Sequence, residues 1–304
     1  MKFLKRIMNW LVAAVLLLSG LNLPAALAED VPVETVTVNV TNTPVRGDVL
    51  LEKTGLRLVR FADEQDAFGY TVMKPVYQNG YLADAVFELH AAEDIVGKEG
   101  TVFYHQGDLV ETLTTSVSGA VKSKTLPLGQ YELREISAPD GYVFDTAPYS
   151  FTLSAADKKT AVVEVRVSAA NTYLPIRVTL RKQKEAIRVD ETAEGMIHQS
   201  MEVVPGEGFV FGLFTSGVMT YGDTQKLPAN TLVATGVTDA TGSLTFSGLY
   251  PHGDYYIKEL SVPVGWHLST EQYPVKLTPE NKVADENVIA VSLDEPILNQ
   301  LIYT

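Results

Sequence analysis

Apolar and polar residues alternate along most of the chain with a period of two. From Val163 to Ala169, valine and alanine alternate with glutamate, arginine and serine, which is the pattern of a strand with one face buried. Most of the 22 glycines and 15 prolines fall between such runs, as in residues 78–80 and 239–242, and mark turns. No long stretch has the apolar spacing of an amphipathic helix. The pattern predicts an all-β chain.

An internal repeat underlies this alternation. The matching stretches are GQYELREISAPDGY (129–142) with GDYYIKELSVPVGW (253–266), and VLLEK (49–53) with VTLRK (178–182). The two long motifs lie 124 residues apart and the two short motifs 129 residues apart. Two similar domains therefore follow one another, and we place them at residues 48–174 and 175–304.

Polar residues occur on the apolar faces of these strands. The alternation turns Lys53, Glu135 and Asn171 inward in the first domain, and Lys182 and Glu259 inward in the second. One interpretation places them at strand ends, solvated or in simple ion pairs, because charged side chains are almost never buried unless paired. However, a buried charge costs several kcal/mol even after relaxation. The same residue types at matched places in two domains therefore favour a functional interpretation.

Burial gives this combination of side chains a specific chemistry. It lowers the pKa of a lysine and raises that of a glutamate, so a neutral amine can face a protonated carboxyl group. The neutral amine is a nucleophile, and the amide of an asparagine held beside it is an electrophile. The carboxyl group can polarise the amide and carry protons to the departing ammonia. Because fixed proximity supplies much of the rate, each domain could crosslink itself without an enzyme.

The segments that carry these residues resemble tandem CnaB-type domains of Gram-positive surface proteins, also called SpaA-like or prealbumin-like pilin domains. The resemblance implies two immunoglobulin-like β-sandwich domains and covers nearly all of the chain after its first 28 residues. It rests on GDVLLEK (47–53), AVFELHAAEDI (85–95), LPLGQYELREISAPDGY (126–142), GEGFVFGLF (206–214), LTFSGLYPHGDYYIKEL (244–260) and DEPI (294–297).

In this family, a lysine on the first strand forms an isopeptide bond with an asparagine or aspartate on the last strand, and a glutamate on a central strand promotes the reaction. The resemblance therefore implies two sets of site residues. They are Lys53, Glu135 and Asn171 in the first domain, and Lys182, Glu259 and Asp294 in the second.

The assignment of Asp294 has an alternative. Asp294 lies 35 residues after Glu259, close to the 36 residues that separate Glu135 from Asn171. In the last strand, however, the alternation turns Asp294 to the face opposite that of the apolar residues that precede it. A β-bulge would restore the parity. Otherwise Asp294 points outward, and either Asn299 replaces it or the second domain has no crosslink.

The first 28 residues have the three parts of a secretory signal peptide. Basic residues (Lys2, Lys5 and Arg6) precede an apolar stretch at 10–21, and small residues flank Leu27 at the expected cleavage site. Twelve apolar residues are too few to span a bilayer. The pattern predicts export, and the family resemblance places the exported chain at the surface or wall of a Gram-positive bacterium.

Charge and cysteine content narrow the functions further. The net charge is −13, and it becomes −16 when the three basic residues of the signal peptide are removed. Such an acidic chain repels phosphate, so nucleic acid is excluded as a partner. The chain has no cysteine, which excludes disulfides and thiolate metal sites. No motif for a metal or an organic cofactor is present, so we expect no cofactor and no enzymatic activity beyond self-crosslinking.

Residues 29–47 precede the first repeat. Asn42 lies 11 residues before Lys53, and Asn171 lies 11 residues before Lys182. Residues 33–42 therefore look like the last strand of a domain whose body is missing. The alternative is a β-prone spacer.

These features predict an exported, pilin-like structural protein whose partners are other surface-protein subunits. The alternatives are an adhesin whose loops bind a host glycan or matrix protein, and an accessory domain of an extracellular enzyme.

Overall fold

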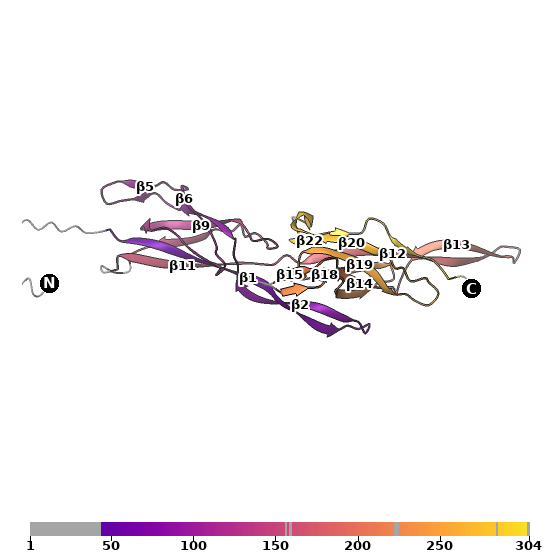
Figure 1. The fold of residues 1–304 in the computed structure, drawn as a ribbon. Helices are drawn as coiled ribbons and strands as arrows, with labels where there is room; N and C mark the ends of the chain where they lie inside the picture. Colours follow the sequence, from indigo (N-terminus) through magenta and orange to yellow (C-terminus); the bar gives the residue numbers. More distant parts are fainter. Residues whose placement is uncertain (1–43, 156, 158–159, 222–224, 284, 303–304) are drawn as a thin grey trace, which may run out of the picture. The chain divides into compact units, whose positions relative to one another are not determined.

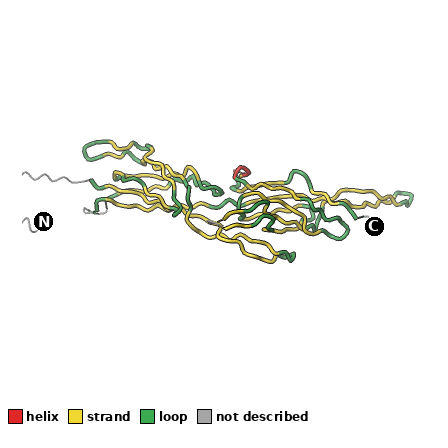
Figure 2. Tube along the Cα trace, in the orientation of Figure 1, coloured by secondary structure: helices red, strands yellow, loops and turns green. Residues whose placement is uncertain are grey.

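The computed structural model describes residues 44–302 except 156, 158–159, 222–224 and 284. Within these residues nearly all regular structure is β, and the one short 3-10 helix is η2 (Pro279–Asn281) (Figure 2). The prediction of an all-β chain is confirmed. The expected signal peptide and the strand at 33–42 that ends in Asn42 lie outside the described residues.

The first domain contains two main sheets (Figure 1). The first sheet comprises β11 (Val162–Asn171), β1 (Arg46–Gln65) and β2 (Thr71–Tyr81), with β7 (Ala120–Lys122) and β8 (Leu126–Pro127) also paired to β1. The second sheet has the order β10 (Tyr149–Leu153), β9 (Gly129–Ser137), β3 (Val86–Ala91) and β6 (Leu109–Thr114). A small ribbon is formed by β4 (Ile95–Val96) and β5 (Val102–Tyr104).

The second domain repeats this plan. Its first sheet has the order β13 (Ile197–Pro205), β12 (Ile176–Glu191), β22 (Val288–Ser292) and β21 (Lys282–Val283), with β18 (Ser243–Gly248) and β23 (Ile297–Asn299) also paired to β12. Its second sheet has the order β17 (Leu232–Val237), β14 (Val210–Thr215), β19 (Gly253–Ser261) and β20 (Gln272–Leu277). The small ribbon comprises β15 (Met219–Tyr221) and β16 (Gln225–Leu227).

Each domain buries its core between its two main sheets. In the first domain, Leu51 from one sheet and Phe87 and Leu133 from the other are fully buried in one apolar cluster. In the second domain, Leu180 and Ile257 occupy the corresponding layers of a separate cluster. The alternation in the sequence produces this arrangement because successive side chains of a strand point to opposite faces.

The first and last strands of each domain are parallel neighbours. In the first domain β1 pairs with β11, with Lys53 opposite Ala169 and Gly55 opposite Asn171. In the second domain β12 pairs with β22 and then with β23. Because parallel neighbours run in the same direction, the chain enters each sandwich at one end of this strand pair and leaves at the other.

Both first strands continue beyond their lysine into a long hairpin. In the first domain, β1 and β2 form the first arm (residues 56–79). In the second domain, β12 and β13 form the second arm (residues 184–204). Each hairpin closes through a tight turn whose glycine, Gly69 or Gly195, has positive φ; L side chains rarely adopt this conformation.

The first arm packs on the second domain. Phe61 is 8% exposed and belongs to the core cluster of the second domain, where it contacts the ring of Tyr221 edge-on at 5.0 Å. At the tip of the arm, Tyr70 Oη donates to the carbonyl of Leu260 at 3.3 Å, and Thr235 donates to Asp66. The core of the second domain therefore includes a side chain supplied by the first.

We expect Phe61→Ala to destabilise the second domain although it lies in the first. Removing a buried phenylalanine leaves a cavity and costs up to about 3–5 kcal/mol. Calorimetry of residues 29–304 should show a lower melting temperature for the transition of the second domain. Phe68→Ala is the matched control because Phe68 lies in the tip of the same arm and is 41% exposed. Equal melting profiles for the two variants would contradict this packing.

Candidate functional site: two buried clusters of lysine, glutamate and asparagine

The first cluster lies between the two sheets of the first domain. Lys53 extends from β1, Glu135 from β9 and Asn171 from β11, and they are 0%, 3% and 6% exposed. Lys53 Nζ lies 3.0 Å from Glu135 Oε1, and Asn171 Nδ2 donates to the same oxygen at 2.9 Å. One carboxylate oxygen therefore holds both the amine and the side-chain amide.

Further contacts fix the orientation of this carboxylate. The backbone N–H of Asp145 donates to Glu135 Oε2 at 2.9 Å, which leaves Oε1 directed at the lysine and the asparagine. Lys53 Nζ also lies 5.1 Å from the centre of the Phe87 ring. Asn171 Oδ1 is buried and has no hydrogen-bond partner among the described residues. Lys53 Nζ likewise has no hydrogen-bond partner by geometry, although it lies at ion-pair distance from Glu135.

Burial sets the electrostatics of the amine. Desolvation lowers the pKa of Lys53, and this effect exceeds the opposing effects of the hydrogen bond and charge of Glu135 and the charge of Asp145. A lowered pKa increases the fraction of neutral amine, which is the nucleophilic form.

The second cluster contains the same residue types from equivalent strands. Lys182 on β12, Glu259 on β19 and Asn299 on β23 are each at most 2% exposed. Asn299 Nδ2 donates to Glu259 Oε2 at 2.7 Å, and the backbone N–H of Ser269 donates to the same oxygen at 2.8 Å. Ser269 follows Glu259 by ten residues, as Asp145 follows Glu135 in the first domain.

The lysine of the second cluster has different partners. Lys182 Nζ donates to the carbonyls of Gln183 at 2.7 Å and Ile297 at 2.9 Å, and it lies 4.6 Å from the centre of the Phe209 ring. Desolvation lowers the pKa of Lys182 to about 8, against the charge of Glu259. Desolvation likewise raises the pKa of Glu259, although hydrogen bonds from Asn299 and Ser269 oppose it. Both shifts favour the neutral pair.

The structure places Asp294 outside the second cluster. Asp294 lies in the bend between β22 and β23 and is exposed, and the buried position beside Glu259 is occupied by Asn299. The register explains the difference: Val178 pairs with Val291, but Lys182 pairs with Ile297, so the last strand contains two extra residues within the bend. Because side chains alternate between the two faces of a strand, inserting two residues leaves Asn299 on the inward face, whereas Asp294 points outward.

With this assignment the two clusters have the same register. Asn171 lies opposite Gly55, two residues beyond Lys53. Asn299 lies opposite Lys184, two residues beyond Lys182. The parity of the apolar residues before Asp294 is the sequence signal that favours Asn299.

The comparison with protein-family models identifies the fold. The model of the SpaA prealbumin-like fold domain matches residues 71–168 and 205–289, one segment in each sandwich and more than half of the chain in total. This protein belongs to the SpaA family of prealbumin-like domains. No curated protein sequence matches the chain.

Solved structures that resemble the chain share little of its sequence. The Bacillus anthracis TIE protein is 17% identical with a TM-score of 0.49, and the match covers 85% of this chain and 34% of that one. A streptococcal ancillary pilin is 20% identical with a TM-score of 0.25, and the match covers 86% and 63%. The shaft pilin SpaA from Lactobacillus rhamnosus GG is 16% identical with a TM-score of 0.28, and the match covers 86% and 99%. The chain thus spans about a third of the TIE structure and under two thirds of the ancillary pilin.

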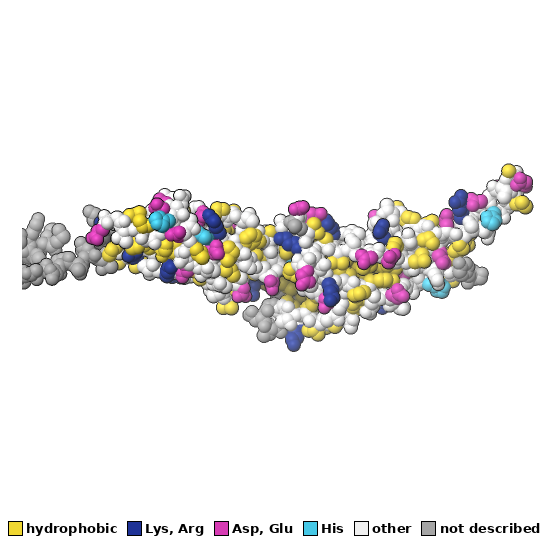
Figure 3. All heavy atoms as spheres, turned by 90° about the horizontal axis from the view of Figure 1, so that it is seen from above, with side chains coloured by type: hydrophobic (Ala, Val, Ile, Leu, Met, Phe, Trp, Pro, Cys, Tyr) yellow, Lys and Arg dark blue, Asp and Glu magenta, His cyan; other side chains and the backbone are white. Residues whose placement is uncertain are grey.

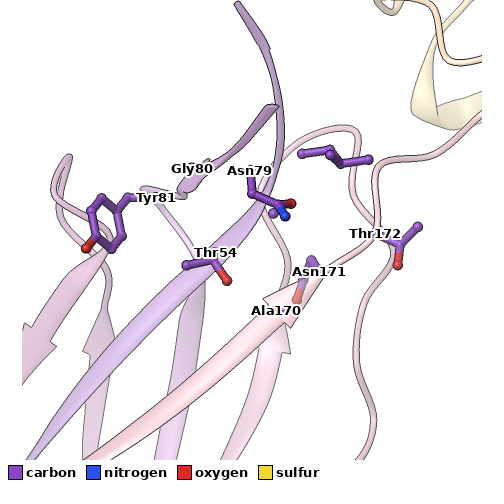
Figure 4. Close-up of a pocket in the computed structure, with 9 residues that line it drawn as sticks. Thr54, Asn79, Gly80, Tyr81, Ala170, Asn171 and Thr172 are labelled. Atoms are coloured by element: carbon purple, nitrogen blue, oxygen red, sulfur yellow. The ribbon is translucent and has the colours of Figure 1, made fainter. Parts of the chain in front are cut away.

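A surface pocket of about 570 Å³ lies next to Asn171 in this SpaA-family chain. It opens where β1 leaves the sandwich between the ends of β2 and β11, and Thr54, Tyr81 and Asn171 border it (Figure 4). Asn171 therefore lies between the buried cluster and a surface pocket.

The described residues contain no helix that is long and apolar enough to cross a membrane. The same residues contain no group of three or more His, Asp or Glu side chains arranged to hold a metal ion.

The lowered pKa of Lys182 predicts a pH dependence of stability. In Asn299→Ala no side-chain amide lies beside Lys182, so its amine is free to titrate. Between about 8 and its ordinary value of 10.5, the unfolded chain binds more protons than the folded chain. The free energy of unfolding should therefore rise as the pH rises, by at most about 1.4 kcal/mol per pH unit.

Urea denaturation between about pH 7.5 and 9.5 measures this slope. The control is the double variant Lys182→Met, Asn299→Ala, which has the same tyrosines and carboxylates but no titrating amine at this position. Coincident pH profiles for the two proteins would show that Lys182 has an ordinary pKa.

Proposed function

We propose that this chain is an exported, pilin-like structural protein of the cell surface, and that intramolecular isopeptide bonds between Lys53 and Asn171 and between Lys182 and Asn299 strengthen its two domains. The observation that carries the proposal is the repetition of one buried arrangement at one register in both domains. Burying a lysine and a glutamate is costly, and stability alone does not explain two such clusters. Export rests on the signal-peptide pattern of residues 1–28.

The proposed reaction is an amide exchange. The neutral Nζ of Lys53 attacks Cγ of Asn171, a new C–N bond forms, and the bond from Cγ to Nδ2 breaks. Protonated Glu135 gives its proton to the leaving nitrogen, which departs as ammonia, and takes a proton back from the attacking amine. In the second domain Glu259 would serve Lys182 and Asn299 in the same way. The pocket beside Asn171 gives ammonia a short route to solvent.

The position of each bond suggests its mechanical role. Lys53 lies on the first strand and Asn171 is the last residue of the parallel last strand. A bond between them carries tension directly from one strand to the other, so residues 54–170 bear no load. Closing a loop of more than a hundred residues would also stabilise each domain by roughly 4–5 kcal/mol in the loop-entropy model.

Intact mass provides the first test. Each Lys–Asn bond releases ammonia, about 17 Da, so residues 29–304 should weigh about 34 Da less than the sequence mass. Lys53→Ala and Asn299→Ala should each restore one deficit of 17 Da beyond the change of the substitution itself. Glu135→Ala should also lack the 17 Da deficit of the first domain, because the variant has no group to carry the proton and the bond does not form.

Asp294→Ala is the control for the second bond and should leave the deficit unchanged. A second-domain deficit of about 18 Da, the mass of water, that disappears in Asp294→Ala would instead assign the bond to Asp294. A folded chain at its full sequence mass would refute the crosslinks.

Single-molecule stretching tests the mechanical role. The crosslinked chain should extend without releasing residues 54–170. In Lys53→Ala, unfolding of the first domain should add an extension of roughly 400 Å, because 117 residues each contribute about 3.5 Å. Equal extensions for the two proteins would mean that the bond lies outside the path of the load.

A further inference from the structure

The two arms are equivalent in the fold but differ in what covers them. Each continues the first strand of its domain beyond the lysine, and each ends in a turn with the same hydrogen-bonding pattern. The turn is closed by Asp66 and Tyr70 in the first arm and by Thr192 and Met196 in the second. The first arm contributes Phe61 to the core of the following domain. The second arm extends beyond the rest of its own domain, at the end where β13 is labelled (Figure 1).

The second arm has one apolar face. The antiparallel register places Ile187, Val189, Ile197 and Val203 on the same side of the ribbon, and these side chains are 50–71% exposed. Met196, at the tip, is 64% exposed. In the space-filling view, hydrophobic and charged side chains lie together on the strands at this end (Figure 3). The register also places Glu185, Glu191 and Gln199 on this side. Apolar side chains exposed among polar ones in this way are typical of an interaction surface.

The second domain shows which surface such an arm binds. The tip of the first arm contacts Thr235 on β17 and the carbonyl of Leu260 on β19. On β14, a phenylalanine pairs with Glu259, and the next residue, Gly212, pairs with Thr235. On β19, Leu260 directly follows Glu259. These positions define the receiving surface of a prealbumin-like sheet.

The first domain has the same surface uncovered among the described residues. On β3, a phenylalanine pairs with Glu135, and the next residue, Glu88, pairs with Thr112. Thr112 therefore corresponds to Thr235 of the second domain. Ile136 directly follows Glu135 and corresponds to Leu260. Thr112 is exposed, and Ile136 and the neighbouring Leu109 are 47% and 53% exposed. Among the described residues there is thus one filled arm-and-sheet contact, one uncovered arm and one uncovered receiving surface.

We infer that the second arm is a docking element whose occupant is the first domain of a second copy of this chain, bound at β6 and β9 as the first arm is bound at β17 and β19. The contact joins two different surfaces, so it leaves an open arm at one end of the pair and an open sheet at the other and can extend into a chain of copies. It requires no covalent bond and so stands apart from the proposed crosslinks. Because every copy is acidic, added salt should strengthen it by screening repulsion.

Sedimentation velocity of residues 29–304 tests the inference, at concentrations from about 1 µM to about 500 µM, where weak contacts become populated. We expect species larger than a dimer to grow with concentration and salt. Val189→Lys on the arm and Ile136→Lys on the sheet should each reduce the association constant at least tenfold. Val264→Lys is the matched control because Val264 is 99% exposed and lies outside the arm.

Mixing the two defective variants gives the sharpest outcome. Val189→Lys retains a working sheet and Ile136→Lys retains a working arm, so an equimolar mixture should form one-to-one dimers and nothing larger. A chain that stays monomeric throughout, or assembly that is unchanged by Val189→Lys, would overturn the inference. An arm-to-arm dimer would also overturn it, and would be recognised because Ile136→Lys would not weaken it. Circular dichroism of each variant checks that it is folded.

Discussion

The structure depends on one costly arrangement, a lysine and a glutamate placed in the dry space between two sheets. In the first domain, Lys53 and Glu135 are each at most 3% exposed and lie 3.0 Å apart. Removing two charges from water is compensated only when the geometry and the remaining hydrogen bonds are nearly ideal. The sandwich supplies part of this compensation, because the strand pairing fixes the lysine beside the last strand, and a backbone N–H ten residues beyond the glutamate orients its carboxylate. Lys53 Nζ and Asn171 Oδ1 nevertheless lack hydrogen-bond partners in the described part of the chain.

The two domains hold the buried lysine and glutamate through different contacts. In the first, the amine faces the carboxylate directly, and Asp145 contributes a second negative charge nearby. In the second, Ser269 replaces that aspartate and two backbone carbonyls hold the amine. In the second domain, desolvation lowers the pKa of Lys182 and raises the pKa of Glu259, so a neutral amine and a neutral carboxyl group are favoured there. The proposed chemistry needs this neutral state, so the two domains offer one reaction in two electrostatic settings.

The fold also links the two sandwiches through the extension of their first strands. The strand that carries the lysine does not end there but continues into an arm, and the first arm completes the core of the next domain through Phe61. One strand therefore carries both the buried lysine of the first domain and the contact with the second domain. The first strand of the second domain continues into an arm in the same way.

The sequence alone determined the all-β class, the repeat and the inward orientation of Lys53, Glu135, Lys182 and Glu259, because these follow from a period of two that every strand must obey. It could not determine which residue of the last strand lies beside Glu259. That choice depends on the two extra residues in the bend before β23, and such an insertion appears only when the strands are paired. The role of the arms was also decided by the tertiary structure alone. Phe61 lies in an ordinary alternating segment, and only the packing of one domain on the next assigns it to a core more than a hundred residues away in sequence.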